Sequence, residues 1–119
     1  MRILIVEDEA ISALALQFLV ERLGHEVVAS VDTGEAAVER AGSAQPDLVL
    51  MDTRLRSAMN GVEAANRIWS EHRVRSVFVS AHGGAELAAD YRGAEPFLSL
   101  VKPVMDDELA AVLERVETP

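Results

Sequence analysis

The chain contains no cysteine, few basic residues and no long apolar segment. Without cysteine it has no disulfide framework, no thiolate nucleophile and no cysteine-based metal site. No apolar run approaches the roughly 20 residues that span a bilayer, and the first residues lack the apolar stretch of a signal peptide, so we expect a cytoplasmic protein that does not bind membranes. The formal net charge of −9 disfavours DNA binding, because DNA phosphates are ordinarily met by clustered Lys and Arg.

The remaining composition is that of one globular domain. Half of the residues are hydrophobic and about a quarter are charged, which is typical of a folded protein rather than a disordered one. A chain of 119 residues buries one core but not two, so we expect a single domain over residues 1–119. The sequence ends soon after its last predicted helix, and we expect no effector domain.

Short apolar runs alternate with longer segments of helical composition along the chain. Each run is continuous and ends abruptly in polar residues, as strands buried on both faces do. The predicted strands are Ile3–Val6, Val27–Ala29, Leu48–Met51, Val77–Val79 and Phe97–Val101. The predicted helices are Ala10–Leu23, Gly34–Ala44, Val62–His72, Ala85–Arg92 and Asp106–Val116. Gly24 is placed to end the first helix and Thr33 to cap the second.

Strict alternation of strands and helices predicts a doubly wound α/β fold. Its parallel sheet is covered by helices on both faces, with right-handed crossovers. In such sheets ligands bind beyond the carboxyl ends of the strands. The residues that follow each strand are therefore the first place to look for a site.

Polar side chains follow four of the predicted strands. Glu7 and Asp8 follow the first, Asp52 the third, Ser80 the fourth and Lys102 the fifth. Three carboxylates at one edge would repel one another unless a cation lay among them. Hard oxygen ligands without His or Cys favour Mg²⁺, and we expect it in preference to Ca²⁺.

The same residues predict a phosphoryl acceptor. A carboxylate is a competent nucleophile towards phosphorus, and a metal ion neutralises charge on the phosphoryl oxygens. Asp52 is the predicted acceptor because it follows its strand directly, whereas Glu7 and Asp8 are adjacent and better arranged to hold the cation. Lys102 and Ser80 are expected to contact phosphoryl oxygens as a point charge and as a hydroxyl donor.

This ordered set, an acidic pair, Asp, Ser and Lys-Pro at successive strand ends, resembles the receiver domains of response regulators along the whole chain. The resemblance implies a five-stranded (βα)5 flavodoxin-like fold with strand order 2-1-3-4-5. It implies Mg²⁺ bound by Asp8, Asp52 and the backbone carbonyl of Arg54, with Glu7 acting through water, and a cis peptide before Pro103.

The resemblance also implies how the protein works in two-component signalling. A sensor histidine kinase or a histidine phosphotransfer protein would donate the phosphoryl group, and phosphorylation would change the binding of a downstream protein. The chain would not be an enzyme beyond catalysing its own phosphorylation and dephosphorylation. A homodimer is compatible with the family.

Two features depart from the common receiver pattern. The loop Thr53–Gly61 is one residue longer than usual and carries Arg54 and Arg56; these side chains either tune phosphorylation or, as we prefer, are simply solvated. Ser99 stands where most receivers have an aromatic residue that moves on activation. Phe97 shares its face of the strand and is expected in the core, whereas Tyr91 is expected to pack on the surface.

The first predicted helix carries more apolar residues than one buried face needs. Ile11, Leu14, Ala15 and Phe18 form one stripe, and further apolar residues adjoin it. The stripe is either a broad core contact or a partly exposed patch that docks a kinase or a phosphotransfer helix. The resemblance favours docking.

Three other functions fit the sequence less well. A phosphatase of the haloacid dehalogenase type needs a second Asp two residues after the nucleophile, and Arg54 stands there. A nucleotide-binding domain needs a glycine-rich first turn, where this chain has acidic residues that repel a pyrophosphate. A pseudo-receiver that acts without phosphorylation is disfavoured by the intact set of site residues, although failure to bind Mg²⁺ would revive it.

Overall fold

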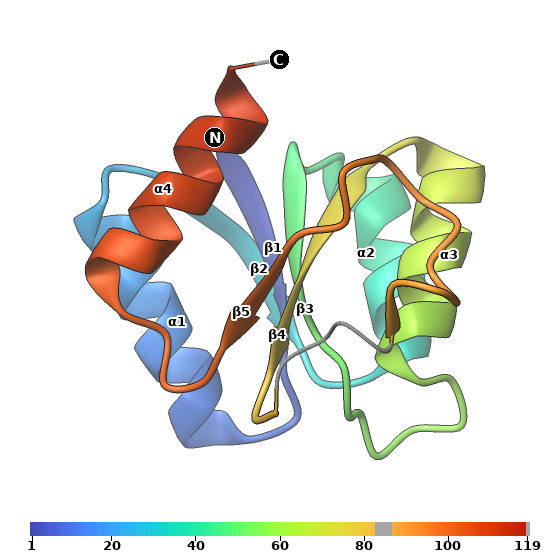
Figure 1. The fold of residues 1–119 in the computed structure, drawn as a ribbon. Helices are drawn as coiled ribbons and strands as arrows, with labels where there is room; N and C mark the ends of the chain where they lie inside the picture. Colours follow the sequence, from blue (N-terminus) through green and yellow to red (C-terminus); the bar gives the residue numbers. More distant parts are fainter. Residues whose placement is uncertain (83–86, 119) are drawn as a thin grey trace.

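The structure, a computed structural model, describes residues 1–82 and 87–118. Its strands form one sheet in the order β2-β1-β3-β4-β5, and each neighbouring pair is parallel. The strands are β1 (Arg2–Val6), β2 (Glu26–Val31), β3 (Leu48–Asp52), β4 (Arg75–Ser80) and β5 (Ser99–Val101). This confirms the predicted doubly wound α/β fold and strand order (Figure 1).

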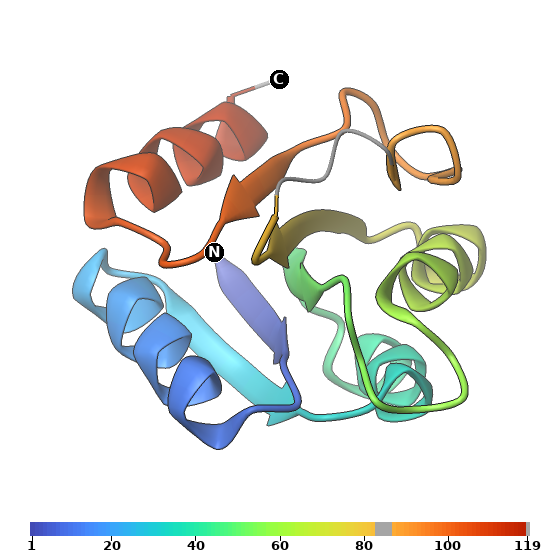
Figure 2. The same ribbon diagram turned by 60° about the horizontal axis from the view of Figure 1, so that its bottom comes forward.

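Two layers of helices sandwich the sheet. Figures 1 and 2 show α1 (Ala10–Arg22) and α4 (Asp106–Glu117) on one face, and α2 (Gly34–Ala44) and α3 (Gly61–His72) on the other. None of the helices in the described ranges is long and apolar enough to cross a membrane.

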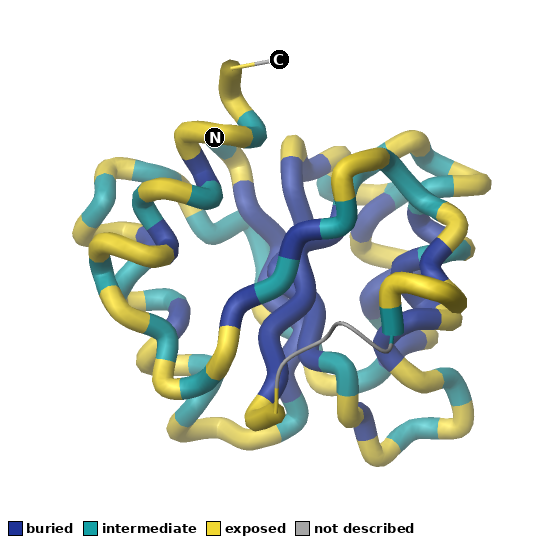
Figure 3. The backbone as a smooth tube through the Cα atoms, viewed as in Figure 1, coloured by how far each residue is buried: buried dark blue, intermediate teal, exposed yellow. Residues whose placement is uncertain are grey.

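Alternate residues of each central strand enter two separate cores. In β1, Ile3 and Ile5 pack with α1 and α4, whereas Leu4 and Val6 pack with α2 and α3. All four side chains are fully buried, and the central strands are dark blue along most of their length in Figure 3. Because a parallel sheet covered on both faces has no polar face, its strands are continuous apolar runs in the sequence.

The helix ends are explained by local chemistry. The Thr33 hydroxyl accepts a hydrogen bond from the Ala36 N–H at 3.0 Å and so caps α2. Gly24 follows Leu23, the C-cap of α1, and has φ +89°, a conformation that glycine adopts without strain. Asn60 and Glu63 bind each other's backbone N–H groups and form a capping box at the start of α3.

The prediction of an α-helix over Ala85–Arg92 is wrong for its described part. Residues 85–86 lie outside the described residues, and the chain from Leu87 to Tyr91 makes a single turn. The N–H groups of Asp90 and Tyr91 both donate to the Leu87 carbonyl, at 3.0 and 3.2 Å. The described residues therefore include four α-helices rather than the five expected.

Asn66 of α3 explains why this turn does not continue as a helix. Its amide donates to the Asp90 carbonyl at 3.0 Å and accepts from the Arg92 N–H at 2.7 Å. A longer helix would use the Asp90 carbonyl and the Arg92 N–H for its own backbone hydrogen bonds. The side chain of a neighbouring helix thus takes the hydrogen bonds that would extend the turn.

Tyr91 lies in the core, so the prediction of a surface tyrosine is wrong. It is buried, and its ring packs edge-on against Phe78 and Phe97, with centroids 5.1 and 5.9 Å away. Phe97 stacks on Phe78 at 5.3 Å and is partly buried against the same core, as expected. The aromatic cluster of this region is therefore formed by Phe78, Tyr91 and Phe97, in the core between the sheet and the helices α2 and α3. Ser99 contributes no aromatic ring to it.

Candidate functional site

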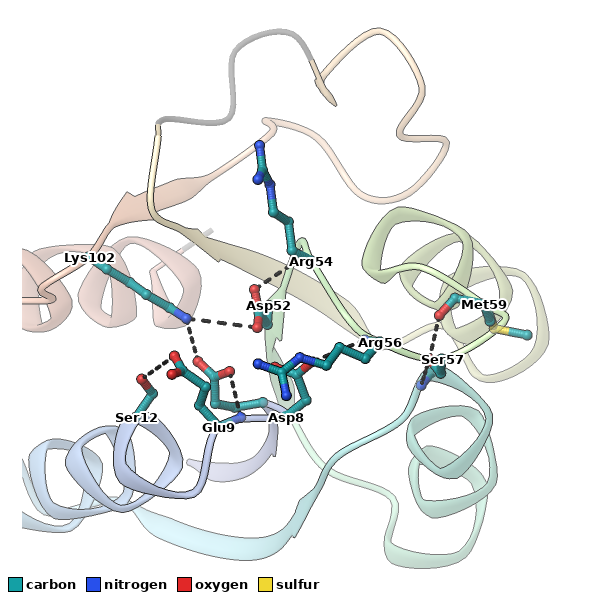
Figure 4. A network of polar contacts seen from close by, with 11 residues as sticks. Asp8, Glu9, Ser12, Asp52, Arg54, Arg56, Ser57, Met59 and Lys102 are labelled. Atoms are coloured by element: carbon teal, nitrogen blue, oxygen red, sulfur yellow. Dashed lines mark hydrogen bonds and ion pairs between the residues drawn. The ribbon is translucent and has the colours of Figure 1, made fainter.

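The carboxyl ends of the strands bring the predicted acidic residues together. Val6 pairs with Met51 in the sheet register, so β1 and β3 end side by side. Glu7 and Asp8 then meet Asp52, and one carboxylate oxygen from each lies within 4.8 Å of the others. Figure 4 shows Asp8 and Asp52 at this edge, with the ammonium of Lys102 pointing towards Asp52.

Lys102 bridges two of the three carboxylates. Its Nζ lies 2.5 Å from Glu7 Oε1 and 3.8 Å from Asp52 Oδ2. Burial disfavours the ammonium, but the hydrogen bond to Glu7 and the charges of Asp52 and Glu7 outweigh this and raise the pKa of Lys102 above its ordinary value. Lys102 is thus a fixed positive charge at neutral pH. The peptide before Pro103 is cis, as expected.

The pKa values of the neighbouring Asp52 and Glu7 carboxyls shift in opposite directions. Burial and the neighbouring Glu7 carboxyl raise the pKa of Asp52 from 3.8 to about 7, against the opposing effect of the Arg54 N–H, which donates to Oδ1 at 3.0 Å. Burial also acts to raise the pKa of Glu7, but hydrogen bonds from Asp52 and Lys102 bring it below its ordinary value. Two close carboxyls resist double ionisation, and Asp52 is the one that retains a proton more readily.

Asp8 has a different cationic neighbour. Its Oδ2 accepts the backbone N–H of Arg56 at 3.0 Å and lies 3.7 Å from the Arg56 Nε. The other loop arginine, Arg54, is exposed, and in Figure 4 its side chain extends away from the carboxylates. Arg56 is 82% exposed, as expected of a solvated loop arginine, but its guanidinium also lies beside Asp8. The sequence carried no signal for this contact beyond the nearness of Arg56 to the acceptor.

The donor set fits a hard divalent cation. Glu7, Asp8 and Asp52 offer oxygen atoms alone, which suits Mg²⁺. Both Glu7 oxygens already have partners, because Oε1 binds Lys102 and Oε2 accepts the Glu9 N–H at 3.2 Å. Asp52 is engaged in the same way, by the Arg54 N–H at Oδ1 and by Lys102 3.8 Å from Oδ2. Metal binding by Asp8 and Asp52, by the Arg54 carbonyl and through a water held by Glu7 therefore stays a prediction.

Ser80 supplies a free hydroxyl at the same edge. It ends β4 and is buried, and its Oγ has no hydrogen-bond partner among the described residues. A buried polar atom without a partner is unfavourable unless something else satisfies it. Its position at the end of β4, next to the strand that ends in Asp52, fits the predicted contact with a phosphoryl oxygen.

An apolar surface lies beside the site. Ile11 is 84% and Phe18 63% exposed on α1, and Leu14 between them is similarly open. A groove of about 360 Å³ runs from Ile11 to Lys102 and Pro103. The stripe on the first helix is thus largely exposed, and the buried contact of α1 is made by Leu16 and Val20 instead.

The chain is similar in sequence and in fold to known receiver domains. The family model for the response regulator receiver domain matches residues 3–114. The transcriptional regulatory protein PdtaR of Mycobacterium tuberculosis (strain CDC 1551 / Oshkosh) is 34% identical over 113 residues, which cover 95% of this chain and 55% of PdtaR. The chemotaxis protein CheY of Bacillus subtilis (strain 168) is 32% identical over 117 residues, which cover 96% of this chain and 95% of CheY.

A solved structure gives the same result for the fold. The signal receiver domain of a modulated diguanylate cyclase from Desulfovibrio desulfuricans G20 superposes with a TM-score of 0.87 at 34% identity, covering 97% of this chain and 91% of that one. The chain thus spans nearly all of some relatives but about half of PdtaR.

Proposed function

Because the chain belongs to the response-regulator receiver-domain family, we propose that it accepts a phosphoryl group on Asp52 in a Mg²⁺-dependent reaction. The donor is a sensor histidine kinase or a histidine phosphotransfer protein, and phosphorylation changes the binding of a downstream protein. The chain catalyses its own phosphorylation and dephosphorylation and no other reaction. The proposal includes a cytoplasmic location.

The observation that carries the proposal is the group of side chains around Asp52. An oxygen of the ionised Asp52 carboxylate attacks phosphorus, the phosphorus–nitrogen bond of the donor phosphohistidine breaks, and the imidazole leaves with the electron pair and takes up a proton. Asp8 and Asp52 would hold Mg²⁺, and the ion would neutralise charge on the phosphoryl oxygens.

Lys102 and Ser80 provide the remaining partners. Lys102 lies within 4 Å of Asp52 and carries its charge at neutral pH. The Ser80 hydroxyl is buried and has no partner among the described residues, so a phosphoryl oxygen would satisfy it. A phosphoryl group on Asp52 would give the Ser80 hydroxyl a partner and Lys102 a further anionic oxygen, which links the modification to the ends of β4 and β5.

The exposed stripe on α1 supports docking of the donor beside the acceptor. Ile11, Leu14 and Phe18 recur at helical spacing and remain open to solvent. The adjoining groove reaches Lys102. A partner helix seated on this stripe would lie next to the acidic cluster.

The test is the intact mass of the protein after incubation with acetyl phosphate and either Mg²⁺ or EDTA. Wild type is expected to gain one phosphoryl group with Mg²⁺ and none with EDTA, and Asp52→Asn is expected to gain none in either. No adduct on wild type, or an adduct that survives the substitution, would contradict the proposal. The first of these outcomes would favour a pseudo-receiver that works without phosphorylation.

A further inference from the structure

Arg56 and Asp8 form a contact that the phosphoacceptor chemistry does not use. The backbone N–H and the side-chain Nε of Arg56 both approach the same oxygen, Asp8 Oδ2, at 3.0 and 3.7 Å. The Asp8 side chain is only 11% exposed, whereas the Arg56 side chain is 82% exposed. The guanidinium is therefore far more open to solvent than the carboxylate. Figure 4 shows the Arg56 side chain extending beside Asp8.

The two cations divide the acidic cluster between them. Lys102 pairs with Glu7 and Asp52, and Arg56 pairs with Asp8. The two cations differ in exposure, because the Lys102 side chain is 24% exposed and the Arg56 side chain is 82% exposed. An ion pair as exposed as that of Arg56 is weak and is easily exchanged.

The loop beneath Arg56 is anchored independently of this ion pair. Ser57 Oγ accepts the Gly34 N–H at 3.1 Å and donates to the Met59 carbonyl at 2.7 Å. The Met59 N–H in turn donates to Glu35 of α2 at 3.2 Å. The backbone at Arg56 is thus held by α2, and its guanidinium can leave Asp8 without unfolding the loop.

We propose that the Arg56 side chain competes with Mg²⁺ for Asp8. It neutralises the carboxylate in the metal-free protein and withdraws when the ion binds, so it raises the Mg²⁺ concentration at which the site fills. The inference rests on the proposed function, because it requires the metal site. As a consequence, phosphorylation of this chain needs a higher Mg²⁺ concentration than it would need if Arg56 did not compete for Asp8.

The experiment is a titration of ¹⁵N-labelled protein with MgCl₂, followed by the backbone amide shifts of Asp8, Thr53 and Arg54. Wild type is compared with Arg56→Gln, which removes the charge, and with Arg56→Lys, which keeps it. Arg40→Gln, at an exposed position of α2, is the control for the same change in net charge away from the site.

Arg56→Gln is expected to bind Mg²⁺ about two- to fivefold more tightly than wild type, the range expected when an exposed ion pair no longer competes. Arg56→Lys is expected to lie closer to wild type than Arg56→Gln does, and the gain of Arg56→Gln is expected to shrink in high salt, which screens exposed charges. Arg40→Gln is expected to match wild type.

Equal affinities for wild type and Arg56→Gln would overturn the inference while leaving the metal site intact. A gain in Arg40→Gln as large as that in Arg56→Gln would also overturn it, because net charge would then explain the effect. If no variant binds Mg²⁺ at this edge, the proposed function fails together with the inference.

Discussion

Replacing Asp52 with asparagine is expected to stabilise the metal-free protein at alkaline pH. Asparagine has nearly the same shape and keeps an oxygen for the Arg54 N–H, so the main change is the loss of a titrating charge. Lys102 then faces one ionised carboxylate, Glu7, in place of two. Without a metal ion, that change removes a repulsion that wild type retains.

The sign and size of the effect come from the raised pKa of Asp52. A rise from 3.8 to about 7, at about 1.4 kcal/mol per tenfold change in proton affinity, gives an upper bound of about 4 kcal/mol. The pKa of Glu7 moves the opposite way in the same pair, so we expect a net gain on the order of 1–2 kcal/mol. The folded protein holds the Asp52 proton more tightly than the unfolded chain, so this stability is present below pH 4 and is lost as the pH rises towards about 7.

The assay is urea denaturation of wild type and Asp52→Asn in EDTA at pH 5 and pH 8, followed by circular dichroism. The difference in the free energy of unfolding is expected to favour the variant and to be larger at pH 8. Saturating Mg²⁺ is expected to reverse the order at pH 8, because the ion stabilises only the protein that binds it well. A variant that is no more stable than wild type at pH 8, or a gain that is larger at pH 5, would refute the reasoning.

Three further predictions concern the fold and are checked by urea denaturation. Phe78→Ala, at a fully buried residue, is expected to lower the free energy of unfolding by about 3–5 kcal/mol. Phe18→Ala, on the exposed stripe of α1, is expected to change it by less than about 0.5 kcal/mol. Similar losses in the two variants would contradict the assigned burial. Gly61→Ala is expected to destabilise by about 1–3 kcal/mol, because its added Cβ would lie 2.1 Å from the Asp52 carbonyl oxygen, and an unchanged midpoint would refute this. Asn66→Ala is expected to lower stability by about 1–2 kcal/mol through two lost hydrogen bonds and to speed amide exchange at Arg92, and unchanged exchange there would contradict its role.

The sheet and the acidic cluster could be predicted from sequence because both depend on short-range patterns. A strand buried on both faces is a continuous apolar run, and Leu48–Asp52 shows this throughout. Once the runs are parallel strands, the residues after them must meet at one edge. The predicted meeting of Glu7, Asp8 and Asp52 therefore needed no knowledge of the loops.

The features that were missed depend on contacts between distant segments. The turn at Leu87 stops because Asn66, on another helix, takes the backbone groups of Asp90 and Arg92. Helix propensity within Ala85–Arg92 carries no trace of that competition.

The contact between Arg56 and Asp8 was missed for a related reason. It depends on the path of the loop after β3, which Ser57 and Met59 fix against α2. A loop path of this kind is set by tertiary hydrogen bonds rather than by the residue types of the loop. The sequence therefore showed that Arg56 was near the acceptor but not which carboxylate it would meet.

The central claim is that Asp52 itself receives the phosphoryl group, and peptide mapping after borohydride reduction tests it most directly. Borohydride converts an aspartyl phosphate to homoserine, so wild type treated with acetyl phosphate and Mg²⁺ is expected to carry that conversion at position 52 and to lose it when EDTA is present. Reduction of Glu7, Asp8 or another carboxylate to its alcohol in place of Asp52, or no reduced residue in phosphorylated protein, would contradict the account.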